Sequence, residues 1–448
     1  MNPWLANKLK KLGNPEPVNI TVLVEVEPNF ADEVKQSLIE SGFTIKSQAF
    51  NFLTVPNVPA DKVSLISKIK HVKTVNYDTP VGAVSFPFPL PFELPLFGPV
   101  SRDDPLVGTL SISEIVAPKK LRAPDLLFPF SPLRILSTQD YKFIPSSEVN
   151  KEVIDVETDL DGSGVKVAVL DTGSMNPLHP MNMFRIKPLS TSIEILPNDG
   201  VGHGSWCLSA VGGLPWPTIY GNSVGMAPKA DLYSIKVLGS AGMGTTSEVL
   251  KGMELAAELG MKIVSMSLGS EPQGGCKDDP TCKAVKTLAD KGIIVVVAAG
   301  NSGPGAGTVG SPGMSPEAIT VGSWSLMDDA PSYFSSRGPT PDGVVKPDVM
   351  GYGGGRKSDD LTPDELIVNG CEGWLDGIYD GILEGFGGLH GTSMSTPQIA
   401  GLLALVEQDR NRDGATLTLA EVQELIAKGR SKDNESGYGL AKLSWFVS

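Results

Sequence analysis

Residues 167–173 read Val-Ala-Val-Leu-Asp-Thr-Gly, a short apolar run that ends in an acid and a glycine turn. Helical patterns such as 246–259 and 283–291 separate several further apolar runs of similar length, at 232–238, 263–268, 293–299 and 318–321. Short apolar strands that alternate with helices are typical of a parallel sheet covered on both faces. The pattern predicts an α/β fold with a doubly wound, mostly parallel sheet, whose ligands bind at the carboxyl ends of the strands.

A different pattern precedes this region. Residues 18–78 follow the order β-α-β-β-α-β, which is typical of a small ferredoxin-like α+β unit. Residues 79–146 are rich in Pro and Phe, most densely at 86–92. Because proline removes backbone donors, we expect a linker here that is laid over a surface through its Phe residues. The sequence thus predicts three parts, residues 1–78, 79–146 and 147–448.

The composition limits the classes of partner. The chain has 448 residues and a net charge of −14, and the acidic excess falls in residues 149–448. An acidic body disfavours nucleic acid and anionic membranes, because both bind a basic face. The chain has no apolar run of about 18 residues that would predict a membrane-spanning helix. Residues 1–15 lack the apolar core of a signal peptide, so we expect either a cytoplasmic protein or a leader missing from this chain.

Two of the four cysteines, Cys276 and Cys282, are separated by five residues. A lone pair of this spacing lacks the second pair or the histidines of a zinc site, so a small disulfide-closed loop is the better interpretation. A disulfide favours an oxidising compartment or the cytosol of a hyperthermophile. We therefore expect an extracellular protein, with a cytoplasmic location as the alternative.

Three polar side chains stand at strand ends or glycine-rich turns: Asp171, His203 in Gly-His-Gly-Ser, and Ser393 in Gly-Thr-Ser-Met-Ser-Thr-Pro. Serine is a weak nucleophile at neutral pH and requires an imidazole base, and the imidazole requires a carboxylate to fix its tautomer. A serine that opens a helix also lies near amides that stabilise an oxyanion. Asn301 follows another buried strand, where its amide could donate to the same oxyanion.

The Asp-Thr-Gly, His-Gly, Ala-Gly-Asn and Gly-Thr-Ser motifs at these four positions resemble, in this order, the signature motifs of the subtilisin-like serine proteases. The resemblance covers about residues 147–445. It implies a serine endopeptidase in which Ser393 is the nucleophile, His203 is the general base and then acid, and Asp171 orients His203. It also implies that Asn301 and the Ser393 amide form the oxyanion hole, and that catalysis needs no cofactor.

The same resemblance implies where substrate binds. The walls of the pocket would be Ser267, Leu268, Gly269, Ala298, Ala299 and Gly300, and its base would be Gly310. The strand that pairs with upstream substrate residues would be formed by Gly242, Met243 and Gly244. A deep pocket with a glycine base and no charge favours large apolar side chains, because burial of apolar area stabilises the complex. A charged side chain there would lose its hydration.

Residues 18–78 resemble the propeptide of this family, which is an inhibitor and folding chaperone. The resemblance implies that its tail, residues 78–85, lies in the active-site cleft and that the chain cuts itself there or soon after. The chain would then be a self-processing proenzyme whose partners are protein or peptide substrates and its own N-terminal unit.

Asp409, Asn411 and Asp413 alternate before a glycine and resemble the start of an EF-hand calcium loop. The expected acid at the twelfth position is displaced by one residue, to Glu421. These residues predict a structural calcium site, and the alternative is a solvated polar turn.

Other polar features are expected to be structural. The acidic stretch 358–390 is interpreted as a solvated loop and Cys207 as a buried packing thiol, while His71 and His179 are expected at the surface or in loops.

Two other functions remain open. One is a binding or scaffold protein on the same fold whose N-terminal unit blocks the cleft permanently, and the other is a cytoplasmic peptidase of narrow specificity.

Overall fold

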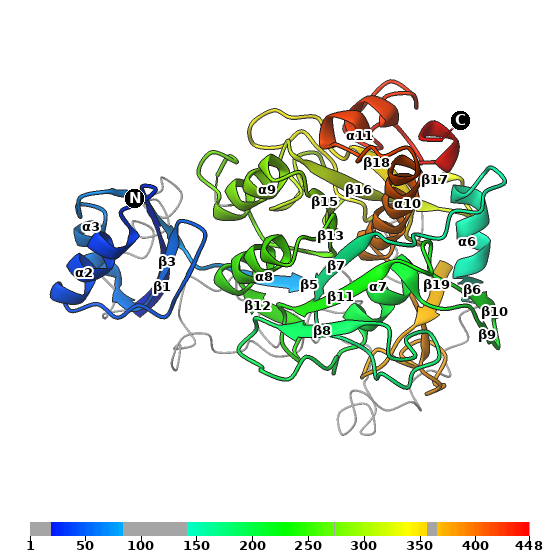
Figure 1. Cartoon of the computed structure of the whole chain (residues 1–448), viewed down its shortest axis with the longest axis horizontal. Coiled ribbons are helices and arrows are strands. Elements are labelled where there is room, and N and C mark those ends of the chain that lie inside the picture. Colours follow the sequence, from blue (N-terminus) through cyan, green and yellow to red (C-terminus); the bar gives the residue numbers. More distant parts are fainter. Residues whose placement is uncertain (1–18, 84–140, 273, 356–364, 448) are drawn as a thin grey trace, which may run out of the picture.

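The computed structural model describes residues 19–83, 141–272, 274–355 and 365–447 (Figure 1). Within these ranges a small N-terminal unit is connected to a larger unit through strand β5 (Pro80–Ala83). Most of the predicted Pro- and Phe-rich linker, and the first residues of the predicted acidic loop, lie outside the described residues. No helix in the described ranges is long and apolar enough to cross a membrane.

The N-terminal unit is an antiparallel sheet with the strand order β2-β3-β1-β4. Its elements are β1 (Asn19–Val26), α2 (Ala31–Glu40), β2 (Ser47–Ala49), β3 (Phe52–Pro59), η1 (Ala60–Lys62), α3 (Val63–Ile66) and β4 (Val72–Tyr77). Helix α2 buries Val34 and Leu38, one turn apart, in the same core as Val22 and Val24 of β1. The predicted α+β order is confirmed, although α3 is only one turn long.

The larger unit is built on an eight-stranded sheet in the order β17-β16-β15-β13-β7-β11-β8, with β18 paired to β16. All of its strand pairs are parallel except β16 with β17. The strands are β7 (Lys166–Asp171), β8 (Lys187–Ser190), β11 (Asp231–Lys236), β13 (Ile263–Met266), β15 (Ile294–Ala298), β16 (Ala318–Ser325), β17 (Ala330–Pro331) and β18 (Val349–Tyr352). The predicted doubly wound, mostly parallel sheet is thus confirmed.

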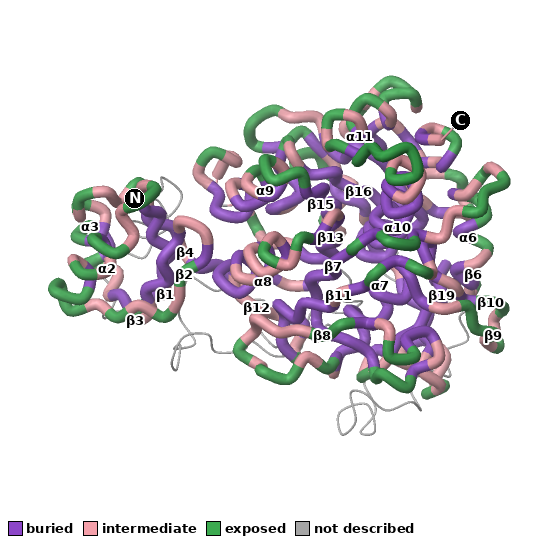
Figure 2. The backbone as a smooth tube through the Cα atoms, viewed as in Figure 1, coloured by how far each residue is buried: buried purple, intermediate pink, exposed green. Residues whose placement is uncertain are grey.

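Helices cover both faces of this sheet: α7 (His203–Gly212) and α10 (Thr392–Arg412) on one, and α8 (Thr246–Glu258) and α9 (Pro280–Asp290) on the other. Strand β7 shows why the strands of this sheet are apolar along their whole length. Val167 and Val169 join the core of α7 and α10, whereas Ala168 and Leu170 join the core of α8 and α9. Figure 2 shows these strands buried between the two helical layers.

A second small sheet has the order β20-β19-β6 and is formed by β6 (Lys142–Pro145), β19 (Glu365–Gly370) and β20 (Phe386–Leu389). Strand β19 is buried along its whole length. The carboxylate of Glu365 accepts hydrogen bonds from Ser325 Oγ and from the main-chain N–H groups of Leu326 and Met327. The prediction of a solvated loop is therefore wrong for β19 and β20. Their apolar side chains belong to the main core, and the acids around them concealed that pattern.

The remaining elements connect the layers: α6 (Ser146–Val153), the hairpin of β9 (Trp216–Thr218) and β10 (Gly221–Ser223), β12 (Met243–Thr245), β14 (Leu268–Gly269), α11 (Leu419–Ile426) and η3 (Leu443–Trp445). The end of the predicted linker, residues 142–145, belongs to the larger unit because β6 pairs with β19. Cys276 and Cys282 form a disulfide at the start of α9, which confirms the predicted pairing.

Candidate active site

The three residues of the predicted triad meet at the carboxyl end of β7. Asp171 is the last residue of β7, His203 is the first residue of α7, and Ser393 is the second residue of α10. Each helix begins directly after a glycine with positive φ, Gly202 at +105° and Gly391 at +136°. Glycine adopts this backbone conformation readily, and other residues rarely do. The glycine-rich turns therefore allow both helices to start at the edge of the sheet.

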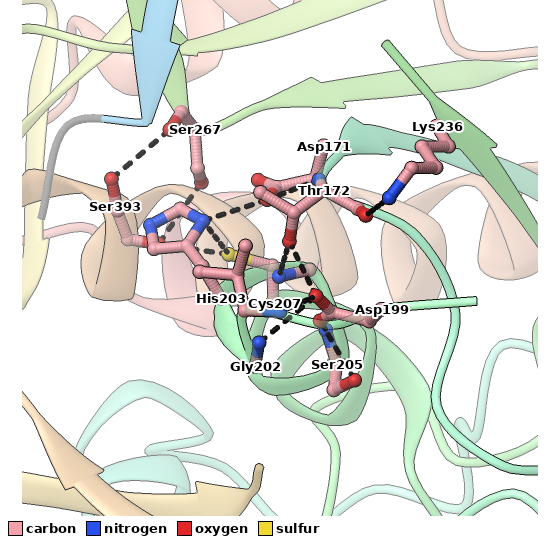
Figure 3. Close-up of polar contacts among 12 residues, drawn as sticks. Asp171, Thr172, Asp199, Gly202, His203, Ser205, Cys207, Lys236, Ser267 and Ser393 are labelled. Atoms are coloured by element: carbon pink, nitrogen blue, oxygen red, sulfur yellow. Dashed lines mark hydrogen bonds and ion pairs between the residues drawn. The ribbon is translucent and has the colours of Figure 1, made fainter. Parts of the chain in front are cut away.

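Asp171 and His203 form a buried pair (Figure 3). Oδ1 of Asp171 lies 2.7 Å from Nδ1 of His203, and the two side chains are 1% and 0% exposed. This contact fixes the orientation of the ring, and Nε2 on its other side is buried without a hydrogen-bond partner. Ser393 lies beside the ring, and its Oγ donates a hydrogen bond of 3.1 Å to the main-chain oxygen of Ser267. The serine hydroxyl thus rests on a carbonyl next to an imidazole nitrogen that lacks a partner.

Asp199 connects the two members of this pair and was not predicted from the sequence. Its buried carboxylate accepts hydrogen bonds of 2.7 to 2.9 Å from Thr172 Oγ1, from the N–H groups of Val201, Gly202 and Ser205, and from Ser205 Oγ. One carboxylate therefore joins the residue after Asp171 to the first turn of the helix that begins at His203 (Figure 3). The available signal was an acid four residues before the histidine, because carboxylates favour helix N-termini.

Lys236, at the end of β11, is a buried cation behind Asp171. Its side chain is 1% exposed, and Nζ donates to the main-chain oxygens of Thr172 at 2.7 Å and Asn198 at 3.1 Å. The ammonium group also lies 3.2 Å from the carboxylate of Glu194. It therefore holds the main chain just after Asp171 against the loop that carries Asp199.

Asn301 lies three residues beyond the end of β15 and contacts the start of α10. Its Oδ1 accepts hydrogen bonds from the main-chain N–H and the hydroxyl of Thr392, at 3.0 and 2.9 Å. Because the amide oxygen is engaged by the residue before Ser393, the orientation of the amide NH₂ group is fixed as well. Asn301 also lines the cavity next to this site.

That cavity has a volume of about 740 Å³. Six of the predicted substrate-binding residues line it: Met243, Gly269, Ala298, Ala299, Gly300 and Gly310. The other four lie in or next to strands β12 and β14: Gly242, Gly244, Ser267 and Leu268. Among the described residues that line the cavity, Glu271 is the one with a charged side chain, and it is exposed.

A strand from the N-terminal part of the chain already lies along this cavity, because Pro80, Gly82 and Ala83 of β5 line it. Strand β5 pairs antiparallel with β12 on one side and with β14 on the other. Gly82 is opposite both Met243 and Gly269, and Ala83 is opposite Leu268. Residues 80–83 of the predicted propeptide tail thus lie between the strand predicted to pair with substrate and the strand that carries the predicted pocket wall. Residues 84 and 85 of that tail lie outside the described residues.

Further polar contacts join the N-terminal unit to the larger unit. Glu25 of β1 forms an ion pair with Lys283 of α9. The main-chain N–H of Phe50 donates to Glu254 of α8 at 2.7 Å. The sheet of the N-terminal unit therefore contacts both helices on this face of the larger unit.

Asp78 forms the third contact, directly before β5. Its carboxylate accepts hydrogen bonds of 2.8 and 2.9 Å from the N–H and Oγ of Ser247, in the first turn of α8. Burial raises the pKa of Asp78 to about 6, although the bonds from Ser247 oppose this shift. The contact is therefore sensitive to protonation.

The predicted calcium loop does not form. Helix α10 continues to Arg412, so Asp409 and Asn411 lie within it and Asp413 lies just after its end. Side chains two positions apart on a helix diverge by about 200° and do not converge on one ion. Glu421 instead accepts a hydrogen bond of 2.7 Å from Arg410. The predicted loop conformation is wrong because the helix runs through the spacing that was interpreted as a loop.

Cys207 lies one turn after His203 in α7. It is fully buried, its Sγ is 3.9 Å from His203 Nδ1, and burial raises the pKa of the thiol well above its usual value. In the described ranges, Asp171, His203 and Cys207 are the one set of three potential ligand side chains whose donor atoms lie within 4.8 Å of one another. That set is the core of the candidate triad rather than a separate metal centre.

The other two histidines with predicted positions have structural partners. His179 is buried, its Nε2 lies 2.7 Å from the main-chain oxygen of Gly385, and burial lowers its pKa. His179 lies in a bend between strands, so its predicted loop position is confirmed, although the side chain is buried. His71 is half-buried, and its Nδ1 lies 2.8 Å from Glu27.

Comparison with known proteins gives consistent matches. The subtilase family matches residues 162–439, which is more than half of the chain. The serine protease AprX of Bacillus subtilis (strain 168) is 36% identical over 301 residues, which cover 63% of this chain and 64% of AprX. Subtilisin Savinase of Lederbergia lenta is 31% identical over 284 residues, which cover 63% of this chain and 90% of Savinase. Pyrolysin of Pyrococcus furiosus is 32% identical over 232 residues, which cover 46% of this chain and 15% of pyrolysin.

The matched parts differ in extent. The chain spans 64% of the length of AprX and 63% of the length of M-protease of Shouchella clausii (strain KSM-K16). The family match covers the main sheet, both helical layers and all four signature motifs. The chain belongs to the subtilase family.

Proposed function

We propose that this chain is a serine endopeptidase that is made as a self-processing proenzyme. The observation that carries the proposal is the buried Asp171–His203 pair, whose Nε2 has no partner and lies beside Ser393. A strand of the chain lies along the adjoining cavity, as a peptide substrate would. Family membership supports the same reaction class.

In the proposed reaction, Ser393 Oγ attacks the carbonyl carbon of the substrate while its proton passes to His203 Nε2. Asp171 holds the imidazole in the required tautomer and stabilises the imidazolium. His203 then gives the proton to the leaving amine, and an acyl-enzyme on Ser393 remains. Water, with its proton taken by His203, attacks this ester. His203 then returns the proton to Ser393 Oγ as the ester bond breaks and the acid product leaves. The Asn301 amide and the Ser393 N–H donate to the oxyanion in both halves. This chemistry requires no cofactor.

Substrates would be proteins or peptides bound in extended form between β12 and β14, where β5 lies now. The residue before the cut bond would enter the cavity beside Ala298 and Gly310. The walls supply main chain and small side chains, so large apolar residues gain the most buried area. Glu271, which is exposed, leaves this preference in place because its charge remains hydrated.

The N-terminal unit would inhibit the enzyme and assist its folding. In the antiparallel register, Ala83 is opposite Leu268 and Gly82 is opposite Gly269. Ser267 directly precedes Leu268, and its carbonyl accepts the Ser393 hydroxyl. We therefore expect self-cleavage of the bond between residues 84 and 85. The Cys276–Cys282 disulfide supports an extracellular location for the mature enzyme.

The test is to express the wild-type chain and Ser393→Ala and to sequence the N-termini that appear. Wild type should give a new N-terminus at residue 85 and should react with a fluorophosphonate, whereas Ser393→Ala should remain intact and unlabelled. Ser395→Ala is the matched control, because it removes a buried hydroxyl without a hydrogen-bond partner from the same helix.

Two results would count against the proposal. Identical fragments from wild type and Ser393→Ala would mean that another protease cuts the chain. A folded wild type that neither cuts nor reacts would favour the alternative of a scaffold protein with a permanently blocked cleft.

A further inference from the structure

A short loop closed by the Cys276–Cys282 disulfide packs behind one wall of the cavity. Cys282, Val309 and Met314 form a small buried cluster, with Cys276 against it. Val309 also lines the cavity. The disulfide therefore lies on one side of this cluster, and the other side is part of the cavity wall.

Asp279 is the centre of the loop and the N-cap of α9. The residue is 3% exposed. Its Oδ1 accepts hydrogen bonds from the N–H and Oγ of Thr281 at 2.9 and 2.6 Å, from the N–H of Cys282 at 3.0 Å and from Ser311 Oγ at 2.9 Å. The first three bonds cap the helix, whereas the bond from Ser311 extends outside the loop to the turn that follows Gly310.

Ser311 transmits this contact to the cavity through the main chain. Its N–H donates to the oxygen of Ser270 at 3.0 Å, and its own oxygen accepts from the N–H of Ser270 at 2.9 Å. Ser270 and Gly310 both line the cavity. Gly310 has no side chain with which to pack, so the position of this wall depends on its main-chain partners and on the groups behind them.

We propose that the disulfide-closed loop 276–282 is a specificity-determining brace, in which Asp279 positions the Ser270–Ser311 wall of the substrate pocket. The inference rests on the proposed function of this site. Asp279 and Ser311 are positioning residues, because the contacts that define the brace are made behind the wall. When the brace is lost the wall relaxes, and the pocket discriminates less between large and small side chains before the cut bond.

The brace also makes selectivity depend on the oxidation state. A dithiol reductant transfers two electrons and two protons, so the Cys276–Cys282 S–S bond breaks, two thiols form and the reductant becomes a cyclic disulfide. The loop then retains the Asp279 cap but loses its covalent closure. The triad is built on β7, α7 and α10 and does not share this loop.

The experiment expresses full-length chains that carry Ser311→Ala, Asp279→Ala, Asp279→Asn or the double change Cys276→Ser with Cys282→Ser. The chains are compared after self-processing and separation of the N-terminal fragment. The readout is the ratio of kcat/KM for two peptides with Phe or Ala before the cut bond. Active enzyme is counted with a fluorophosphonate that has no side chain for this pocket. Thr287→Ala is the matched control, because its hydroxyl bonds only to the main chain of the same helix, at Lys283.

We expect Ser311→Ala to lower the Phe/Ala ratio about threefold to tenfold through a higher KM for the Phe peptide, because the variant loses the buried contacts of Ser311 Oγ with Asp279 and Thr281. The Phe/Ala ratio should also fall in the double cysteine variant and in wild type treated with the dithiol. Asp279→Asn should restore most of the ratio lost in Asp279→Ala, because an amide oxygen accepts the same bonds. The extent of fluorophosphonate labelling should stay near that of wild type in the variants. The Phe/Ala ratio of Thr287→Ala should also stay near the wild-type value.

Folded variants that lose thermal stability while the Phe/Ala ratio stays constant would overturn the proposal and leave the loop as a purely structural clip. The absence of labelling in wild type would instead contradict the proposed catalytic function. If Asp279→Ala fails to fold, Ser311→Ala alone decides, because it leaves the helix cap intact.

Discussion

The two sides of the candidate active site are built in different ways. The acid–base side consists of Asp171 and His203 at the ends of core elements, braced by the buried carboxylate of Asp199. The substrate side consists of short strands and turns rich in Gly and Ala, with β5 paired along them and a disulfide-closed loop behind. Changes on the first side should therefore alter the rate for every substrate, and changes on the second should alter the choice among substrates.

The largest effect is expected from Asp171→Asn. An amide in place of the carboxylate leaves the shape intact but favours the wrong imidazole tautomer, so kcat should fall about 10⁴-fold. The Phe/Ala selectivity ratio should be unchanged, since the pocket is untouched. Steady-state kinetics on both peptides, with circular dichroism as the control for folding, tests this. A change in selectivity as large as the change in rate would contradict the separation of the two sides.

Asp199→Ala should have the second-largest effect. It leaves buried N–H groups of the α7 turn without their acceptor, so stability falls by about 1–3 kcal/mol. A small displacement of His203 should reduce kcat about 10²-fold. Because Asp199 acts through position, the pH–rate profile should change as His203 loses its fixed orientation. Asp199→Asn retains an acceptor oxygen and should recover part of the activity. Equal rates in wild type and Asp199→Ala would remove its positioning role.

The third prediction concerns the strand that lies between the two sides. Asp78 has an ordinary pKa near 3.8 and a pKa of about 6 when docked on Ser247. Well below pH 3.8 the carboxyl is protonated in both states, and docking of the N-terminal unit is strongest. As the pH rises to about 6, Asp78 ionises in the released unit before it ionises in the docked unit, so the docking affinity falls. Above about pH 6 the docking affinity stays constant. The full shift corresponds to at most about 10²-fold in affinity.

Gel filtration of the processed protein at pH 5.0 and 7.5 measures this effect as the fraction of N-terminal fragment that remains bound. Asp78→Asn should bind as tightly at pH 7.5 as at pH 5.0. Asp32→Asn is the matched control, because Asp32 is exposed on α2 and pairs with Lys35 of the same helix. The same pH dependence in Asp78→Asn as in wild type would assign it to other carboxylates.

The sequence predicted best where local pattern and structure share a cause. Apolar strands followed by polar residues place Asp171 and Asn301 at one edge of a parallel sheet, and the glycine turns place His203 and Ser393 at helix starts. The calcium loop was wrong because burial of α10 against the sheet carries the helix past Asp409, and no local spacing reveals that packing. Strand β19 was missed for the same reason, since its partners β6 and β20 are distant or hidden among acids.

The smallest effect is expected from Gly310→Ala, which adds one methyl group to the base of the pocket. Its Cβ would lie 3.1 Å from the main-chain oxygen of Ser270, so the wall must move by a few tenths of an ångström as well as lose volume. The peptide with Phe before the cut bond should lose about tenfold in kcat/KM relative to the Ala peptide, because one methylene in an apolar pocket is worth about 1–3 kcal/mol. Combining Gly310→Ala with Ser311→Ala tests whether the methyl acts through the same wall. If it does, the relaxed wall should accommodate the methyl, and the two losses of selectivity should be less than additive. Fully additive losses would mean that Gly310 only sets the pocket volume, and a fall in the rate for both peptides alike would mean that the two sides of the site are coupled.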